Sequence, residues 1–377
     1  MNMKILILTA ATGGGHIRAA VAIEKHLKDN CPGVEVRVAD ALKTISSVLD
    51  KTVCDGYHFL ATKAPKMFGK LYESTNQESH FANLVPKLSG LFRRRLFPLI
   101  EEFQPDAIIT THPFVTEMIS DLKADGKLDA PLLCVMTDYG PHKTWLSDHV
   151  DAYIVSSEDM ADQMVRYLKV PADKVYPFGI PVHDVFFEKA DRQALLREME
   201  LDPDKMTILV MAGSFGVNNI LSVFREITAL PEDFQLILIT GRNEKLYEAF
   251  EEEIKTSPKT CKLVYFTTEV EKYMKAANLI VTKPGGLTVS EALACNIPLA
   301  VFDAIPGQEE DNAQFLMSHG MAVRIGKGDS CAKTIQTLLQ DEEKLRRMKE
   351  SCEKFDKSRS VPNMLDLIHR LLEEKSE

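Results

Sequence analysis

The sequence predicts an α/β protein made of two domains, each built around a parallel β-sheet. Short apolar runs alternate with longer helical patterns, which is the signature of βαβ units. The alternation pauses after about 180 residues and then restarts, and 377 residues suffice for two domains with separate cores. Because open sheets of this kind bind ligands at the carboxyl ends of their strands, functional residues are expected in the loops after the predicted strands.

The predicted strands form two series. The first is expected at residues 4–9, 34–38, 107–111, 132–136 and 152–155. The second is expected at residues 207–211, 235–240, 261–265, 279–281 and 299–302. Turn-forming residues separate the two series. The expected organisation is an N-terminal domain of residues 1–180, a linker of 181–205, a C-terminal domain of 206–360 and an amphipathic helix within 361–377.

The composition excludes several classes of protein. The formal net charge is -10, with 45 Lys and Arg against 55 Asp and Glu, which argues against general nucleic-acid binding. The seven cysteines are scattered and include no C-x-x-C pair, so neither a disulfide framework nor a zinc ribbon is expected. No apolar run has the length of a signal peptide or a membrane span. These features favour a cytoplasmic protein.

A glycine-rich segment, residues 9–16, follows the first predicted strand and opens a helix. Glycines such as Gly14 and Gly15 let the backbone approach a ligand closely, and the N–H groups of the helix start favour an anion or a polarised oxygen. A dinucleotide-binding fingerprint fails here, because its third glycine is missing. His16, which ends the segment, is a candidate base for a hydroxyl proton, since imidazole titrates near neutrality. The alternative is a plain glycine turn with a solvent-exposed histidine.

A second group of polar residues follows the third and fourth predicted strands. His112 comes directly after one strand, and the Thr-Asp-Tyr run of residues 137–139 comes after the next. His142 and Trp145, the only tryptophan, follow shortly after. Asp138 and His142 are candidates for shaping an acceptor pocket. The alternative is turn and capping chemistry around an apolar tryptophan.

Two segments of the second half suggest a phosphate site. Gly213 and Ser214 repeat the arrangement of strand, glycine turn and helix seen near the N-terminus. Residues 282–292 place a glycine pair at the end of a strand, so that the first N–H groups of the next helix and its dipole face the ligand. Such a site neutralises a diphosphate without a metal, and Glu291 within the helix is suited to paired ribose hydroxyls.

A third segment of the second half carries several amide and carboxylate groups. It is the run from Gln308 to Asn312, which suits the hydroxyls of a sugar. The alternative for this run is a solvated loop.

No metal site is expected. Asp202 and Asp204 match the D-x-D pattern of metal-dependent sugar transferases, but they precede a strand, where Asp and Pro simply form a turn. Neither an H-E-x-x-H motif nor a closely spaced Cys/His set occurs.

Taken together and in this order, the motifs resemble the monogalactosyldiacylglycerol synthase and processive diacylglycerol glucosyltransferase group of glycosyltransferase family 28. The similarity covers roughly residues 4–325. It implies a GT-B architecture, in which two Rossmann-like domains face each other across a cleft. It also implies the transfer of a hexose from a UDP-sugar to diacylglycerol with inversion, without a metal or other cofactor.

The resemblance also implies roles for individual residues. His16 would be the base for the acceptor hydroxyl, with Asp138 orienting it or sharing the role. The acceptor pocket of the first domain would include Gly14, Gly15, His112, Tyr139, His142 and Trp145. The second domain would bind the UDP-sugar through Gly213, Ser214, Lys283, Gly285, Gly286, Thr288, Glu291, Gln308, Glu309 and Asn312.

A lipid acceptor requires contact with a bilayer. Residues 51–100 carry eight Lys or Arg against three Asp or Glu, a local net charge of +5 that leaves -15 for the rest of the chain. Mixed apolar and basic side chains suit a peripheral contact with anionic lipid at the inner face of the cell membrane. The candidate contact residues are Phe92, Arg93, Arg94, Arg95 and Phe97. The alternative is a core-packed helix with a solvated arginine face.

Three other functions are compatible with this pattern. One is transfer of N-acetylglucosamine to a peptidoglycan lipid precursor, and another is the epimerisation of UDP-N-acetylglucosamine. The third is a UDP-sugar sensor without activity. The Thr-Asp-Tyr run with His142 and Trp145 favours the diacylglycerol group. Glucose is preferred to galactose as the sugar only on the resemblance to bacterial members of this group.

Overall fold

The computed structural model describes residues 2–11, 14–45, 86–212, 217–302, 304–326 and 329–376. These residues form two compact units, which are described separately. The first unit contains residues 1–184, 305–311 and 357–377, and the second contains 185–304 and 312–356. The chain therefore passes from the first unit to the second and returns to the first for its last helix.

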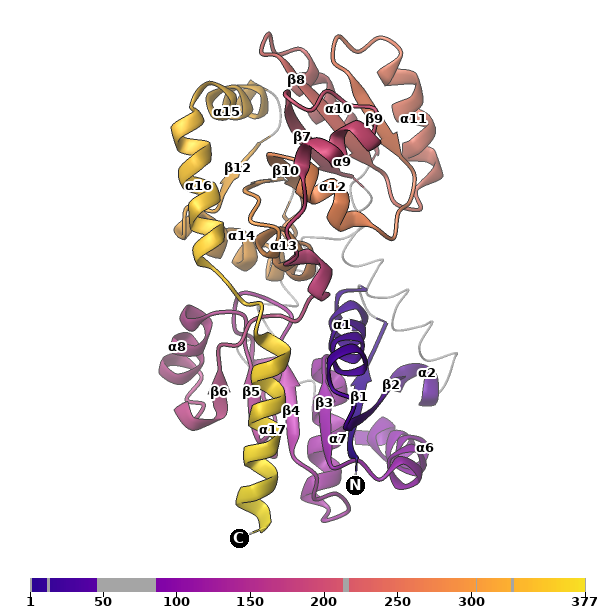
Figure 1. Cartoon of the computed structure of the whole chain (residues 1–377). Coiled ribbons are helices and arrows are strands. Elements are labelled where there is room, and N and C mark those ends of the chain that lie inside the picture. Colours follow the sequence, from indigo (N-terminus) through magenta and orange to yellow (C-terminus); the bar gives the residue numbers. More distant parts are fainter. Residues whose placement is uncertain are drawn as a thin grey trace. The chain divides into compact units, whose positions relative to one another are not determined.

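The first unit is a six-stranded parallel sheet with helices on both faces (Figure 1). The sheet order is β2-β1-β3-β4-β5-β6. Its strands are β1 (Met3–Thr9), β2 (Val34–Asp40), β3 (Ala107–Thr110), β4 (Leu132–Val135), β5 (Ala152–Ile154) and β6 (Val175–Tyr176). Its helices are α1 (Gly15–Asn30), α2 (Ala41–Ile45), α6 (Pro86–Phe103), α7 (Pro113–Ala124), α8 (Glu158–Tyr167) and α17 (Ser360–Ser376), with short 3-10 turns at Lys143–Trp145, Ala172–Lys174 and Asp184–Phe186.

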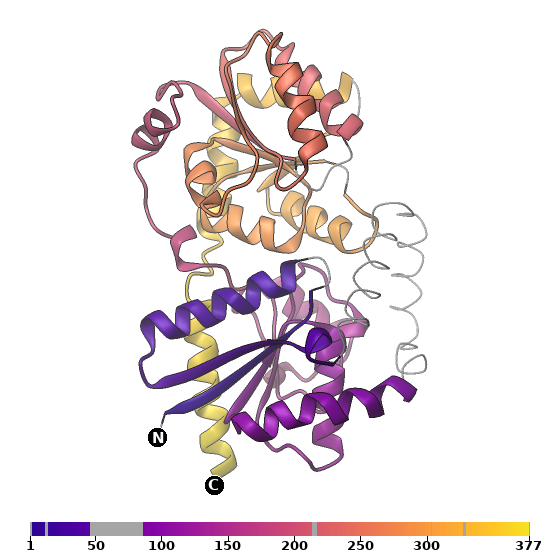
Figure 2. The same cartoon turned by 90° about the vertical axis from the view of Figure 1, so that its right-hand side faces the viewer.

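Alternating side chains of β1 supply both faces of this sheet, because successive residues of a strand point to opposite sides. Ile5 and Ile7 pack against α1 and the C-terminal helix α17, whereas Leu6 and Leu8 pack against α2, α6, α7 and α8. The amphipathic pattern near residue 361 thus forms a helix whose apolar stripe completes the core of the first unit. Figure 2 shows α17 lying beside this sheet after the chain has returned from the second unit.

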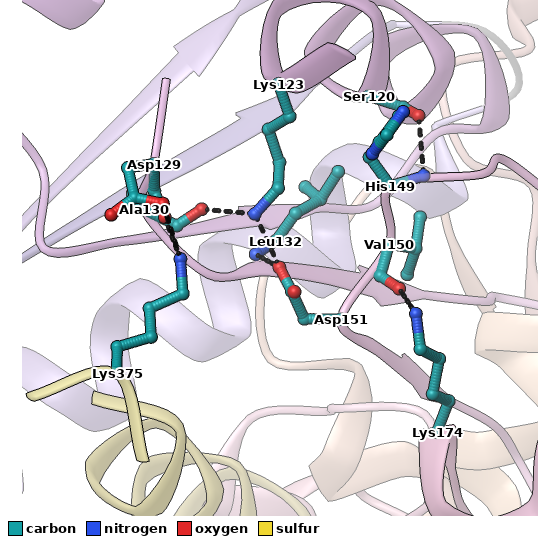
Figure 3. Close-up of polar contacts among 10 residues, drawn as sticks. All are labelled: Ser120, Lys123, Asp129, Ala130, Leu132, His149, Val150, Asp151, Lys174 and Lys375. Carbon is teal, nitrogen blue, oxygen red and sulfur yellow. Dashed lines mark hydrogen bonds and ion pairs between the residues drawn. The ribbon is translucent and has the colours of Figure 1, made fainter. Parts of the chain in front are cut away.

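A polar network fixes the amino ends of β4 and β5 (Figure 3). The carboxylate of Asp151 accepts hydrogen bonds from Lys123 Nζ and from the backbone N–H of Leu132, both at 2.7 Å. Lys375 of α17 donates to the backbone oxygen and the carboxylate of Asp129. Because these groups pair with one another, this end of the sheet is held by structural contacts.

The second unit is also a six-stranded parallel sheet, with the order β12-β11-β10-β7-β8-β9. Its strands are β7 (Met206–Met211), β8 (Phe234–Ile239), β9 (Cys261–Val264), β10 (Leu279–Thr282), β11 (Leu299–Val301) and β12 (Ala322–Arg324). Its helices are α9 (Arg192–Glu198), α10 (Val217–Thr228), α11 (Glu244–Ile254), α12 (Val270–Ala276), α13 (Gly286–Ala294), α15 (Asp329–Gln340) and α16 (Glu342–Lys354), together with α14 (Gln308–Ser318) from residue 312 onward. One face is covered by α10, α11, α15 and α16.

The fold class expected from the sequence, two Rossmann-like α/β domains, is confirmed, and each of the ten expected strands is present. β6 and β12 were not expected, because they are edge strands that are only partly buried, whereas the equally short β5 and β11 are fully buried and apolar. The Asp202 carboxylate accepts a hydrogen bond from the Asp204 N–H at 3.0 Å, which confirms a turn at this position. Within the described ranges, no helix is long and apolar enough to cross a membrane.

Candidate active site

Both sheets have a topological switch point. Here the chain adds the next strand on one side of a central strand and a later strand on its other side. In the first sheet β1 lies between β2 and β3, so the loops after β1 and β3 are neighbours. In the second sheet β7 lies between β8 and β10, so the loops after β7 and β10 are neighbours. Ligands of open α/β sheets bind at such points, outside the carboxyl ends of the strands. The glycine motifs of the sequence are located at these two points.

His16 lies at the first switch point, in the first turn of α1. Gly14 precedes the helix with a φ of 73°, a left-handed conformation that favours glycine. The Thr137 hydroxyl, after β4, lies 3.0 Å from His16 Nδ1, and the Thr111 hydroxyl, after β3, lies 3.0 Å from the His16 backbone oxygen. Residues that follow three adjacent strands thus fix the backbone and the ring of one histidine.

Aromatic side chains surround the His16 ring. His112 meets it edge to face at a centroid distance of 4.8 Å, and the Trp145 ring lies 5.8 Å away. His112 and Trp145 are buried, whereas His16 remains partly accessible. The structure therefore brings together three residues that the sequence placed at one site.

Both histidines are held in the neutral form. Burial lowers the pKa of His16 from 6.5 to about 4, although a hydrogen bond with the Thr111 backbone opposes this shift. Burial and the neighbouring His16 lower the pKa of His112 well below its usual value. The sequence suggested titration near neutrality, and desolvation accounts for the difference. A neutral imidazole can accept a proton at pH 7.

Asp138, Tyr139 and His142 are buried near the ends of the same strands, whereas Gly14 is exposed and Gly15 is half-buried. The Asp138 carboxylate accepts a hydrogen bond from Gln308 Nε2 at 2.9 Å, while the Thr137 hydroxyl occupies the Nδ1 side of His16. His142 Nδ1 lies 2.8 Å from the Thr144 hydroxyl, and Tyr139 is buried. The participation of Asp138 in catalysis stays a prediction.

The second switch point carries the start of α13. Gly285 is the N-terminal cap of this helix and has no side chain with which to cap the first N–H groups. The φ of Gly285 is -70°, and apart from its chain neighbours no described residue has an atom within 4 Å of where a Cβ would stand. Among the described residues, neither backbone conformation nor packing therefore requires glycine here. Gly286 and Glu291 are buried, and Lys283 and Thr288 are half-buried.

The polar run that begins at Gln308 divides between the two units. Asn312 is buried and donates from Nδ2 to the backbone oxygen of Pro284 at 2.9 Å, so it supports the loop after β10. Gln308 and Glu309 belong to the first unit, where Glu309 accepts a hydrogen bond from the Ile305 N–H at 2.7 Å. The sequence placed all three residues in one donor site, and their binding roles stay predictions.

Several predicted site residues lie outside the described part of the chain. Gly213 and Ser214 lie outside the described residues, as do the side chains of Phe92, Arg93 and Arg94. Arg95 donates to the Ile45 backbone oxygen, and Phe97 is half-buried against the core.

Thr137 lies in the Thr-Asp-Tyr run, but its contact with His16 was not predicted, because the two residues are 121 positions apart in the sequence. Sequence reasoning also missed Phe266, after β9, which is 47% exposed with the Arg242 guanidinium 4.5 Å above its ring.

In the part of the chain that the structure describes, no group of three or more His, Cys, Asp or Glu side chains is placed to hold a metal ion. The acidic and imidazole groups at the first switch point are distributed among hydroxyl, amide and aromatic neighbours.

Comparisons with known proteins match the chain over almost its whole length. Residues 16–182 match the family model of monogalactosyldiacylglycerol (MGDG) synthase, and residues 207–364 match that of the glycosyltransferase family 28 C-terminal domain. The processive diacylglycerol beta-glucosyltransferase of Staphylococcus carnosus is 32% identical over 374 residues, which cover 98% of this chain and 93% of the relative. The protein of the same name from Bacillus pumilus is 29% identical, with coverages of 97% and 94%.

Solved structures share the fold at low sequence identity. The MurG protein of Acinetobacter baumannii has a TM-score of 0.67 at 16% identity, covering 98% of this chain and 99% of that one. The UDP-GlcNAc 2-epimerase of Neisseria meningitidis has a TM-score of 0.63 at 16% identity, covering 98% and 100%. These likenesses support the fold alone, whereas the full-length relatives define the family. The chain belongs to the processive diacylglycerol β-glucosyltransferase family, within glycosyltransferase family 28.

Proposed function

We propose that this protein transfers a glucosyl residue from UDP-glucose to diacylglycerol at the membrane surface, with inversion at the anomeric carbon. The observation that carries the proposal is the environment of His16. A neutral, partly accessible imidazole is held by Thr137 at the switch point of the first sheet. The names of the full-length relatives supply the substrate class, and glucose is preferred to galactose on the same ground.

His16 is proposed to act as the general base. As the acceptor hydroxyl oxygen forms its bond to the anomeric carbon, its proton moves to the imidazole, and the bond between that carbon and the UDP oxygen breaks. UDP leaves with the electron pair of that bond. The Thr137 hydroxyl orients the His16 ring. This orientation matters because a small displacement of a reacting group slows the reaction strongly.

The start of α13 is proposed to hold the diphosphate. The N–H groups of its first turn, which Gly285 cannot cap with a side chain, and the helix dipole favour an anion, and the bare Cα of Gly285 gives the phosphates room. Glu291 is suited to the ribose hydroxyls, and Asn312 holds the loop after β10 through Pro284. Phe266, with Arg242 beside it, offers an exposed aromatic ring for the uracil ring of UDP at the same edge of the sheet. UDP-sugar binding is consistent with the fold neighbour HepE of Anabaena, solved with UDP-glucose.

Residues 51–100, with their net charge of +5, are proposed to contact anionic lipid and hold the protein on the inner face of the membrane. Sedimentation with anionic and with neutral liposomes tests this contact. Charge reversal at Arg93, Arg94 and Arg95 should reduce binding to anionic vesicles, whereas reversal at the exposed Lys25 and Lys28 of α1 should not. Binding that ignores both lipid charge and the arginine variant would remove this part of the proposal.

The transfer reaction itself is tested with purified protein and diacylglycerol in anionic liposomes. Labelled UDP-glucose and UDP-galactose are supplied in parallel, and the lipid products are separated by chromatography. A glucosylated diacylglycerol is the expected product. UDP-sugar binding without any lipid product, or interconversion of free UDP-sugars, would contradict the proposed function.

A further inference from the structure

A cavity of about 740 Å³ lies within the second unit, at the end of the sheet opposite the glycine motif. Its lining includes Met206, which begins β7, and Asn278 and Pro298, which directly precede β10 and β11. The cavity therefore lies at the amino ends of these strands, and none of the residues expected to bind the UDP-sugar lines it. Its volume falls within the range of small-molecule sites, roughly 300–1,000 Å³.

The charged groups of the lining are unevenly distributed. Those that are half-buried are all cations, whereas every carboxylate in the lining is exposed. The half-buried cations are Arg192, Lys205 and Lys275, and the exposed carboxylates are Glu188, Asp204, Glu342 and Glu353. Because a charge is strongest where water is partly excluded, the inner part of the cavity is positive.

Arg192 is held in place by neutral groups. Its two terminal nitrogens donate to the Pro203 backbone oxygen at 3.0 Å and to the Lys205 backbone oxygen and Asn278 Oδ1 at 2.8 Å. Its Nε atom is buried and has no hydrogen-bond partner among the described residues. A guanidinium that is fixed by neutral acceptors keeps its full charge without a paired carboxylate.

Lys275 shows the same pattern, since its ammonium donates to the Val185 backbone oxygen. Lys205 differs, because it pairs with Asp233 at 2.9 Å. Two lining cations thus have only neutral hydrogen-bond partners, and buried apolar side chains of Phe186 and Ile297 lie in the same lining. This combination suits a ligand with an anionic head and a small apolar part.

We propose that this cavity is a second ligand site, which binds a phosphate monoester through Arg192 and Lys275. A dianionic phosphate matches the charge of two cations whose hydrogen-bond partners are neutral. The lining also contains residues from the two places where the chain passes between the units, namely Phe186 after residue 184 and Glu353 before residue 357. A bound molecule would therefore contact both connecting segments.

The test is titration calorimetry on the full chain saturated with UDP, so that the proposed nucleotide site is occupied. Sodium phosphate, glycerol 3-phosphate and monomeric dihexanoyl phosphatidate serve as probes, which separates a free phosphate from a soluble ester and from a lipid headgroup. We expect at least one probe to bind at millimolar concentration or below. The probe that binds most tightly shows whether the site recognises free phosphate, a soluble phosphate ester or a lipid headgroup.

Two variants locate the binding. Lys275→Met removes one cation, and Ala190→Trp fills the cavity from an exposed lining position, without disturbing the contacts of Arg192 with the backbone. Each should weaken binding at least about tenfold, which corresponds to about 1.4 kcal/mol. Arg225→Met removes an exposed cation outside the lining, paired with Glu253, and should leave the affinity unchanged.

Absence of binding by all three probes, or equal affinity in wild type and in both cavity variants, would overturn the proposal. A separate titration with UDP distinguishes this failure from failure of the proposed function. That function requires nucleotide binding, and the cavity variants should retain it.

Discussion

The carboxyl edges of the two sheets each have a switch point and differ in chemistry. In the first unit, the loops after β1, β3 and β4 supply imidazoles and hydroxyls, with the His16 ring held by Thr137 and flanked by His112. In the second unit, the loop after β10 supplies a helix start capped only by a glycine, the unobstructed Gly285, and the supporting Asn312. A switch point only provides a place where loops meet. The residues that follow each strand determine whether the site is suited to proton transfer or to anion binding.

The amino ends of the strands offer a second comparison. In the first unit they are joined by the pairs that Lys123 forms with Asp151 and Lys375 with Asp129. In the second unit they border a cavity in which two of the three half-buried cations, Arg192 and Lys275, have neutral hydrogen-bond partners. The same end of a sheet is thus closed by ion pairs in one unit and left open to a ligand in the other.

Loss of the base should give the largest effect. His16→Ala is expected to lower kcat by about 10²–10⁴-fold, since general base catalysis contributes about that much. Formation of labelled lipid product measures it. His26→Ala, on the same helix and paired with Asp184 at the surface, is the control and should keep nearly full activity. A His16 variant that retains most of its activity would refute the base assignment.

The glycine of the second edge should give the next largest effect. Gly285→Ala is compatible with its backbone conformation and, apart from its chain neighbours, meets no described residue within 4 Å, so the thermal stability should not change. The methyl group would occupy the proposed phosphate site and weaken UDP binding by about 10- to 100-fold, or about 1.4–2.8 kcal/mol. Calorimetry with UDP checks this, and Gly33→Ala, also in open space, is the matched control. Unchanged UDP affinity in the Gly285 variant would argue against the proposed diphosphate site.

Glu291→Gln should weaken UDP binding by about tenfold, because a hydrogen bond to a charged group is worth about 1.5–3 kcal/mol and the amide replaces part of it. Glu248→Gln, on the exposed side of α11, serves as the control. Fluorescence or calorimetric titration with UDP gives the affinity. If the two variants bind UDP equally well, Glu291 has no ribose role.

The pH profile tests the state of His16. The folded-state pKa of about 4 lies below the ordinary 6.5, so the fold favours the neutral form. Its stabilising contribution is present above pH 6.5 and is lost as the pH falls from 6.5 towards 4. We expect kcat/KM to persist at pH 5.5, where an unperturbed histidine base would lose about tenfold. An acid limb centred near pH 6.5 would contradict a buried, neutral base.

Thr137→Val should have the smallest effect, about fivefold on kcat, since a single neutral hydrogen bond contributes about 1 kcal/mol. The UDP affinity should stay the same, because Thr137 belongs to the first unit. Thr137→Ser restores the hydroxyl and should restore the rate. A serine variant as slow as the valine variant would assign the loss to packing of the methyl group.

The comparison also shows how far sequence reasoning reaches. Strands such as Ile5–Leu8 and Ile208–Val210 are buried on both faces, and continuous apolar runs of this kind are visible in a sequence. The pattern of the last helix is equally visible in Met364 and Ile368. The sequence does not show which sheet it covers, because either sheet accepts an apolar stripe.

Contacts across the sheet were beyond prediction. The Thr137–His16 and Gln308–Asp138 hydrogen bonds join residues 121 and 170 positions apart, and no local pattern encodes such pairs. The lowered pKa of His16 also depends on burial by distant residues, among them Trp145. The positions of the functional loops were predictable from the strands, whereas the partners of each side chain were not.

In the proposed division of roles, the carboxyl edge of the first sheet takes up the proton and that of the second sheet binds the donor. The UDP dissociation constant of His16→Ala, measured by calorimetry beside its turnover, tests this division most directly. We expect a constant within about twofold of the wild-type value, while turnover falls about a thousandfold. A variant that loses UDP affinity in proportion to its activity would contradict the division of roles.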